Sequence, residues 1–204
     1  MNNIIGVDAD GVILNFLHQW EVAAKSALRR TISMQSGAYD LSERYQLTEK
    51  ECTKVWNKFH NDNHWRMIPE IPGAAEAIKK LIGFGYEPHV ITAIPQHLLF
   101  DRIFNFHKIG MPQLKVHCVS HNKQPKLEEL SPFVYFDDNP AHIEEAYNVN
   151  IPHRVIIPAP GHQHTSHFAT HVAINLANAV NHLIDTNVLM DLKRAPLLKR
   201  NAKL

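Results

Sequence analysis

The sequence predicts an α/β protein with a Rossmann-like parallel sheet, and three observations support this. Short apolar segments recur along the chain, helix-like segments separate them, and the first apolar segment ends abruptly in acidic residues. A strand that is covered on both faces is apolar at every position. Strands that alternate with helices form a parallel sheet with right-handed crossovers. We therefore expect one core sheet that carries a helical insert.

Five segments have the composition of buried strands. They are 4–7 (IIGV), 89–92 (HVIT), 115–119 (KVHCV), 133–136 (FVYF) and 154–157 (RVII). Pro72 opens a helix-like segment with one apolar face, and Gly85 provides its stop. Asn139 or Pro140 opens another helix between the last two strands. The pattern then predicts a long helix over 168–190 without a further strand.

Residues 15–68 interrupt this alternation and contain no convincing strand. Two amphipathic stripes predict a pair of helices here: Leu17, Trp20, Ala24, Ala27 and Leu28, and then Cys52, Val55, Trp56 and Phe59. Thr48 and Glu51 form a capping box before the second helix. We expect the three tryptophans to pack between the helices, with stacking on a substrate as the alternative. The predicted organisation is a core (1–14 and 69–190), a helical insert (15–68) and a basic tail (191–204).

Composition excludes several classes of protein. The 204 residues are 45% apolar and 20% charged, as in an ordinary globular protein, and the formal charge of +1 gives no overall attraction to nucleic acid or membranes. Cys52 and Cys118 form no CxxC pair, which favours a reducing, cytoplasmic location. Asp8 and Asp10 interrupt the first apolar stretch, so we expect no signal peptide, and no apolar run is long enough to span a membrane.

Polar side chains follow three of the predicted strands. Asp8 and Asp10 follow the first strand, Thr92 follows the second, and Asp137 and Asp138 follow the fourth. Ligands of doubly wound sheets bind outside the carboxyl ends of the strands, where these residues would meet. Carboxylates that lie close together repel one another unless a cation compensates them. Mg²⁺ prefers carboxylate, carbonyl, water and phosphate oxygens. The pattern predicts a Mg²⁺ site that binds phosphate.

The motifs VDADGVILNF, VITAIP and VYFDDNPAHIEEA resemble those of the haloacid-dehalogenase-like (HAD) phosphohydrolases over residues 4–158. A receiver domain also clusters Asp, Thr and Lys, but its acid pair comes first, so the order found here excludes it. The resemblance implies a Rossmann-like HAD core with a five-stranded parallel sheet. It also implies that the insert is a small helical cap, which reads the leaving group and excludes water.

The resemblance further implies a role for each motif residue. Asp8 would be the nucleophile and form an aspartyl-phosphate, which divides one displacement into two. Asp10 would protonate the leaving oxygen and then deprotonate water, and Thr92 would hydrogen-bond the phosphoryl group. The residues implied around the phosphate are Ala9, Gly11, Thr92 and Ala93. The implied Mg²⁺ ligands are Asp8, Asp10 through its backbone carbonyl, Asp137 and Asp138.

Two features of the resemblance concern reaction and substrate. The active-site lysine would be Lys123 or Lys126, which both lie between the third strand and the Asp pair. Asp10 favours a phosphatase or phosphotransferase over a dehalogenase, because dehalogenases lack this second acid. The chain is most similar to small 5'(3')-deoxyribonucleotidases, although those usually carry an acid before Phe where this chain has Asn15 and Phe16.

The expected function is Mg²⁺-dependent hydrolysis of a small phosphorylated metabolite, with a nucleoside monophosphate as one candidate. The alternatives are a phosphate-binding or regulatory protein with little turnover, and a polynucleotide end-phosphatase suggested by the basic tail. A histidine group comprises His162, His164, His167 and His171, and His167 and His171 form an i, i+4 pair on the expected helix. We expect these side chains to lie at the surface, with a metal site or a substrate contact as the alternatives.

Overall fold

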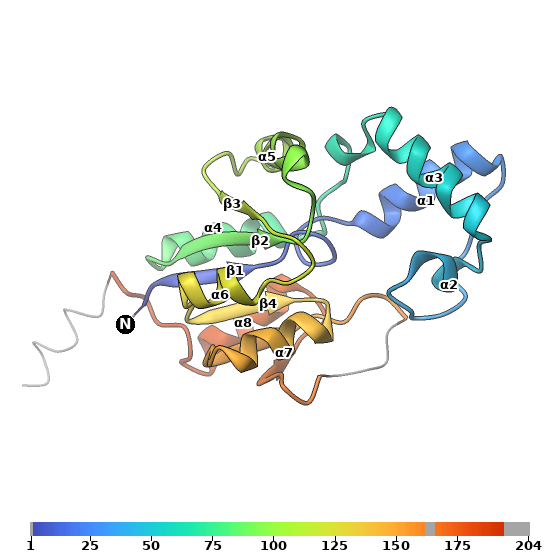
Figure 1. Ribbon diagram of the computed structural model, residues 1–204. Coiled ribbons are helices and arrows are strands. Elements are labelled where there is room, and N and C mark those ends of the chain that lie inside the picture. Colours follow the sequence, from blue (N-terminus) through green and yellow to red (C-terminus); the bar gives the residue numbers. More distant parts are fainter. Residues whose placement is uncertain (1, 162–165, 194–204) are drawn as a thin grey trace, which may run out of the picture.

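The computed structural model describes residues 2–161 and 166–193 (Figure 1). Its sheet has six strands in the order β3-β2-β1-β4-β5-β6, and every neighbouring pair is parallel. The strands are β1 (Ile4–Val7), β2 (Glu87–Thr92), β3 (Lys115–Cys118), β4 (Val134–Asp137), β5 (His153–Ile156) and β6 (His171–Val172). The predicted parallel α/β sheet is confirmed, with one strand more than the sequence suggested.

The segment after β5 differs from the prediction. A single helix over 168–190 is wrong: the segment contains β6, which pairs with β5, and then α8 (Leu176–Asp185). Asn175 caps α8 by accepting a hydrogen bond from the Asn178 N–H (2.8 Å). A strand of two residues has no periodicity, so a hydrophobic pattern cannot reveal it.

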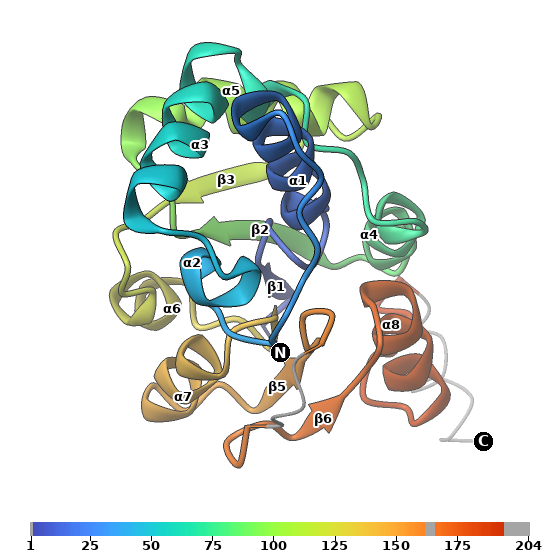
Figure 2. The same ribbon diagram turned by 90° about the vertical axis from the view of Figure 1, so that its right-hand side faces the viewer.

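Helices cover both faces of the sheet (Figure 2). Helix α4 (Ala74–Gly83) and α8 lie on one face, and α6 (Gln124–Leu130) and α7 (Pro140–Asn148) on the other. The short η2 (Gln96–Leu98) leads into α5 (Leu99–Lys108), which lies beside β3 at the edge. Strand β1 lies in the middle of this core, and its residues Ile5 and Val7 are fully buried.

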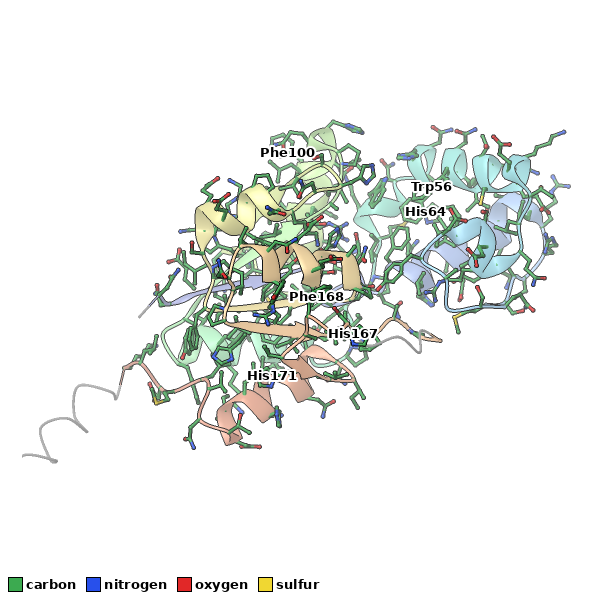
Figure 3. All side chains as sticks on the ribbon, turned by 60° about the horizontal axis from the view of Figure 1, so that its bottom comes forward. Trp56, His64, Phe100, His167, Phe168 and His171 are labelled. Carbon is green, nitrogen blue, oxygen red and sulfur yellow. The ribbon has the colours of Figure 1, made fainter. Side chains whose placement is uncertain are left out.

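The insert after β1 is helical, as predicted. It contains α1 (Phe16–Leu28), α2 (Leu41–Tyr45), α3 (Glu49–Asn61) and the short η1 (His64–Arg66). The Thr48 and Glu51 capping box is present at the start of α3. Trp20 and Trp56 join α1 to α3 with ring centroids 4.5 Å apart, and Trp65 packs on Phe59 at 4.9 Å. The expected packing of the tryptophans between helices is confirmed, and stacking on a substrate stays a prediction. Figure 3 labels Trp56 within the insert.

Two adjacent chain segments connect the insert to the core. The Asn15 N–H donates to the Pro69 carbonyl (2.8 Å), and the Ile71 N–H donates to the Ile13 carbonyl (2.8 Å). This short antiparallel connection places the helices beyond the carboxyl ends of the strands (Figure 1). The insert therefore covers the sheet edge that carries the acidic residues. Within the described ranges, no helix has the length and apolar character needed to cross a bilayer.

Candidate active site at the carboxyl edge of the sheet

A tight turn after β1 positions the first acidic motif. The Asp8 N–H continues the sheet by donating to the Phe136 carbonyl (2.9 Å). The Ala9 carbonyl then accepts hydrogen bonds from two N–H groups, those of Ile13 (2.9 Å) and Leu14 (2.8 Å). Gly11 lies inside this turn with φ +79°, a left-handed conformation that favours glycine. The turn leaves Asp8 at the sheet edge and carries Asp10 away from it.

The strand-end acids of β1 and β4 meet, as the sequence predicts. One carboxylate oxygen each from Asp8, Asp137 and Asp138 lies within 4.8 Å of the others. Asp137 is fully buried and Asp8 is nearly so. The neighbouring positions of β1 and β4 in the sheet produce this convergence from residues about 130 positions apart. We call these three residues the acidic cluster.

Lys123 provides the positive charge of this cluster. Its buried Nζ donates to Asp8 Oδ1 and to Asp137 Oδ2, each at 2.7 Å. Burial alone would lower the pKa of Lys123, but the adjacent carboxylates outweigh burial and raise it. Glu145 fixes the lysine backbone by accepting its N–H (2.8 Å). Of the two lysines that the sequence left open, Lys126 lies outside the cluster and pairs with Glu129 on α6.

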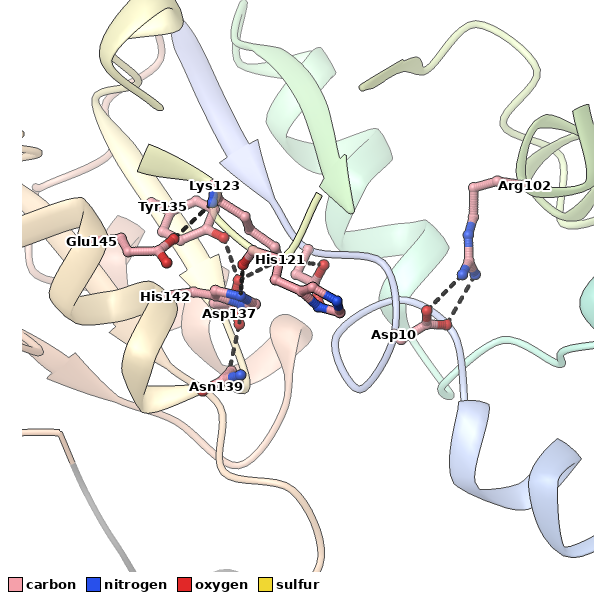
Figure 4. Close-up of polar contacts among 10 residues, drawn as sticks. Asp10, Arg102, His121, Lys123, Tyr135, Asp137, Asn139, His142 and Glu145 are labelled. Carbon is pink, nitrogen blue, oxygen red and sulfur yellow. Dashed lines mark hydrogen bonds and ion pairs between the residues drawn. The ribbon is translucent and has the colours of Figure 1, made fainter. Parts of the chain in front are cut away.

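Protein donors surround the carboxylate of Asp137 (Figure 4). Its Oδ1 accepts from the Asn139 N–H (2.8 Å) and faces His142 Nδ1 (3.3 Å), and its Oδ2 accepts from Lys123 and the Tyr135 hydroxyl. Burial alone would raise the pKa of Asp137, but the charges of Lys123 and His142 lower it. Asp137 thus remains ionised and orients the lysine. The sequence analysis identified neither Tyr135 nor His142, because neither lies at a strand end beside another polar residue.

Asp8 and Asp138 face a different electrostatic environment. Burial is the largest cause that raises the pKa of Asp8, to about 6, and Lys123 only partly offsets it. Burial and the charges of Asp137 and Asp8 raise the pKa of Asp138 well above its usual range. Three carboxylates lie near one ammonium group, so ionisation of all three would leave the cluster with an excess of negative charge. A donor set of carboxylate oxygens with this excess charge fits a hard divalent cation such as Mg²⁺.

Asp10 lies outside the acidic cluster, on the side of α5. Its two oxygens accept hydrogen bonds from Arg102 Nη1 (2.9 Å) and Nη2 (2.6 Å), and Figure 4 shows this pair apart from the cluster. The Arg102 side chain is 1% exposed and stands over the Trp65 ring. This bidentate pair holds the Asp10 carboxylate on the α5 side of the cavity, and its role as acid and base stays a prediction. The metal contact through its backbone carbonyl stays a prediction.

A cavity of about 520 Å³ lies between the insert and the sheet edge. The sequence-predicted residues that line it are Asp8, Asp10, Gly11, Thr92, Ala93, Lys123 and Asp138. Ala9 does not line the cavity, because its side chain is fully buried in the core. The insert contributes Trp56 to the wall, together with Tyr39 and Arg44, which the sequence analysis did not identify. The cavity is larger than a phosphate group and has an apolar side.

Two further features of the sequence are Asn15, which lines the cavity, and the histidine group. Asn15, the position that departs from the nucleotidase motif, caps α1 by accepting a hydrogen bond from the His18 N–H (3.2 Å). His167 and His171 are not on a helix, so the expected i, i+4 pair is wrong. Figure 3 shows both on the core, where His171 packs against His153 with ring centroids 5.7 Å apart. His162, His164 and residues 194–204 lie outside the described residues.

Comparison with known proteins places the fold. No protein-family model and no curated protein matches the chain. Among solved structures, a HAD family hydrolase from Deinococcus radiodurans with bound phosphate and sodium is similar over 92% of this chain and 97% of its own (TM-score 0.65, 13% identity). The chain has the HAD fold. A predicted phosphoglycolate phosphatase from Haemophilus somnus (TM-score 0.62, 16% identity, 88% of this chain and 97% of that chain) shares it.

The HAD fold alone does not specify the reaction. A dehalogenase solved with an intermediate complex is similar to this HAD-fold protein over 88% of this chain and 96% of that chain (TM-score 0.58, 14% identity). The reaction must therefore be inferred from the side chains at the carboxyl edge. The matched regions include both the α/β core and the helical cap region after β1, because they extend over most of the chain.

Gly11 offers a test of how closely the turn fits the acidic cluster. A Cβ on Gly11 would overlap the carboxylate of Asp138. Gly11→Ala is expected to lower the free energy of unfolding by about 2–4 kcal/mol, from left-handed strain plus the clash. Gly110→Ala is the matched control, because Gly110 has φ +76° with open space around it. Urea unfolding measures both variants, and an equal loss of stability in the two would contradict this arrangement.

Proposed function

We propose that this protein is a Mg²⁺-dependent phosphomonoester hydrolase that acts on a small phosphorylated metabolite through an aspartyl-phosphate on Asp8. The observation that carries the proposal is the position of Asp8 at the cavity, beside buried Lys123 and within the acidic cluster. The Asp8 carboxylate can act as a nucleophile, and it lies beside the Lys123 ammonium group and beside carboxylates that can bind a metal cation. This arrangement suits phosphoryl transfer. This reaction depends mainly on positioning and on neutralising charge.

The acidic cluster is the proposed cation site. Asp8 and Asp138, supported by Asp137 and by the backbone carbonyl of Asp10, would hold Mg²⁺. The bound ion supplies charge neutralisation for the cluster and for the phosphate oxygens. The structure supports this assignment through the close carboxylate oxygens and through the unbalanced negative charge around Asp138.

The side chains of the cavity provide the remaining chemistry. A carboxylate oxygen of Asp8 attacks phosphorus, and the bond to the leaving oxygen breaks as Asp10 gives that oxygen a proton. Water then attacks the aspartyl-phosphate and gives its proton to Asp10. This hydrolysis releases inorganic phosphate and restores the Asp8 carboxylate. Lys123 stabilises the negative charge in both steps, and Thr92 and Ala93 lie on the cavity wall at the end of β2. Asp10 must leave Arg102 for both proton transfers.

A metal-dependent phosphatase assay tests the proposal. We expect phosphate release from p-nitrophenyl phosphate with added Mg²⁺, its loss with EDTA and its return with excess Mg²⁺. A broad panel of phosphoesters, including nucleoside monophosphates and a 5'-phosphorylated oligonucleotide, then ranks the substrate classes. Binding of phosphate analogues without hydrolysis of any ester would contradict the enzyme and support a regulatory protein that retains the fold.

Asp10→Asn separates proton transfer from cation binding. We expect kcat to fall by about 10²–10⁴-fold, because the amide cannot exchange the proton. The increase in melting temperature produced by Mg²⁺ should remain, since the Asp10 side chain lies outside the acidic cluster. Asp185→Asn, at an exposed position of α8, is the control. Wild-type turnover in Asp10→Asn would exclude Asp10 as the acid and base.

A further inference from the structure

Arg44 is a buried cation on the insert side of the cavity. It belongs to α2, only 1% of its surface is exposed, and it lines the same cavity as Asp8 and Lys123. A charged group in such a position loses its hydration, and this loss is costly unless an opposite charge or a set of hydrogen bonds compensates it. The partners of Arg44 therefore indicate whether the chain alone satisfies it.

Among residues 2–161 and 166–193, every hydrogen-bond partner of the Arg44 guanidinium is electrically neutral. Its Nε donates to the Ala38 carbonyl (2.7 Å), its Nη2 to the Gly37 carbonyl (3.2 Å), and its Nη1 to the Pro160 carbonyl (2.8 Å) and the Met34 sulfur (3.1 Å). These bonds fix the orientation of the planar group without neutralising its charge. They also join the insert to the loop after β5.

Arg44 differs in this respect from the other two Lys or Arg side chains that are buried in the described ranges. Lys123 contacts two carboxylates and Arg102 binds one through two hydrogen bonds. Within the same ranges, no carboxylate lies within 4 Å of the Arg44 guanidinium nitrogens. The described part of the chain therefore holds a cation in place at the cavity without supplying its counter-charge.

Tyr39 lines the same cavity and contacts a residue of the acidic cluster. Its hydroxyl donates to the backbone carbonyl of Asp138. Arg44 and residues of the acidic cluster thus line one cavity, whose wall also includes apolar Leu41 and Trp56. A ligand with an anionic group at each end and an apolar middle would match this distribution.

We propose that Arg44 binds a second anionic group, a carboxylate or a phosphate, on the leaving-group side of the substrate. This inference rests on the proposed function, because it takes the transferred phosphoryl group to lie at Asp8. A guanidinium attracts either anion through its charge and its N–H groups, and the four bonds given above leave one Nη2 N–H of Arg44 to donate to it. The leaving group of a nucleoside monophosphate carries no anionic group. Nucleoside monophosphates would therefore be weaker substrates than phosphoesters whose leaving group carries a carboxylate or a second phosphate.

Three matched aryl esters test the proposal: 4-carboxyphenyl phosphate, 4-carbamoylphenyl phosphate and 1,4-phenylene bisphosphate. With Mg²⁺, we expect kcat/KM for one or both anionic esters to exceed that for the carbamoyl ester by about 10–100-fold, the range of a charge-assisted hydrogen bond. Comparison of kcat/KM for 4-carboxyphenyl phosphate with that for 1,4-phenylene bisphosphate shows whether the second site prefers a carboxylate or a phosphate. Equal kcat/KM for all three esters in the wild-type protein would overturn the proposal.

Variants then assign the preference to Arg44. Arg44→Gln should reduce the ratio of anionic to carbamoyl kcat/KM to about one, and Arg44→Lys should retain part of it. Lys25→Gln, which removes an exposed cation from α1, should keep the wild-type ratio. A wild-type ratio in Arg44→Gln would contradict the assignment. If Arg44→Gln fails to fold, Arg44→Lys takes its place. A ratio of about one in Arg44→Lys, or a ratio equal to that of the wild type, would then contradict the assignment.

A binding measurement distinguishes this failure from failure of the proposed function. Calorimetry with Mg²⁺ compares 4-carboxybenzyl phosphonate with 4-carbamoylbenzyl phosphonate, neither of which can be hydrolysed. Tighter binding of the carboxylated compound, by about 10–100-fold and dependent on Arg44, supports the second anion site even if no ester is hydrolysed. Equal affinities overturn the site, whatever the phosphatase assay shows.

Discussion

Asp8→Asn is expected to lower kcat for phosphoester hydrolysis by about 10⁴-fold or more, because the amide cannot form the aspartyl-phosphate. The fold should persist, since the substitution preserves the side-chain shape and Lys123 keeps its contact with Asp137. Phosphate release with Mg²⁺ measures turnover, and the far-ultraviolet circular dichroism spectrum with the melting temperature measures the fold.

Asp62→Asn is the matched control for Asp8→Asn. Asp62 lies at the end of α3 and forms an exposed pair with Lys58, away from the cavity. Such pairs contribute little to stability, so both turnover and melting temperature should stay close to wild type. Full activity in folded Asp8→Asn would exclude Asp8 as the nucleophile.

Lys123→Met is expected to cause the largest loss of stability, because it removes the cation from between two buried carboxylates. The Lys123 side chain is 1% exposed, and its Nζ is 2.7 Å from both Asp8 and Asp137. Breaking a buried pair by removing one partner costs about 3–5 kcal/mol, since the remaining charge stays buried without compensation. Urea unfolding without Mg²⁺ measures this loss, and added Mg²⁺ should recover part of it.

Lys126→Met is the control for charge and side-chain volume, from the same helical segment. Lys126 pairs with Glu129 at the surface of α6, so its loss should change the free energy of unfolding by less than about 1 kcal/mol. Similar effects of the two substitutions would contradict the central position of Lys123. The comparison also answers by experiment which of the two lysines belongs to the site.

Sequence periodicity predicts the core elements because their burial is regular. Strand β1 is apolar at both alternating positions, since helices cover both faces of the sheet, and the neighbouring β4 follows the same pattern up to Asp137. The meeting of Asp8 with Asp137 also follows from the pattern, because parallel strands end at one edge. The choice between the two lysines required the structure. Lys123 and Lys126 are only three positions apart, and the path of the chain before α6 determines which of them reaches the acidic cluster.

Other residues of the site carry no local signal. Arg102 belongs to an amphipathic helix, where a charged residue usually faces solvent, and only the packing of α5 against the loop after β1 brings it to Asp10. Arg44 belongs to a helix of five residues inside the insert, too short for a hydrophobic pattern. Tertiary packing positions both, so sequence analysis of single segments missed them.

Trapping the intermediate tests the central claim most directly. The protein is mixed with a phosphoester and Mg²⁺, quenched in acid within the first turnover and treated with borohydride, which reduces an acyl phosphate to an alcohol. Peptide mass spectrometry then locates the reduced residue. We predict reduction at Asp8 that depends on both substrate and Mg²⁺ and is absent from Asp8→Asn. Reduction at Asp10, Asp137 or Asp138 instead, or hydrolysis without any reduced aspartate, would contradict the account.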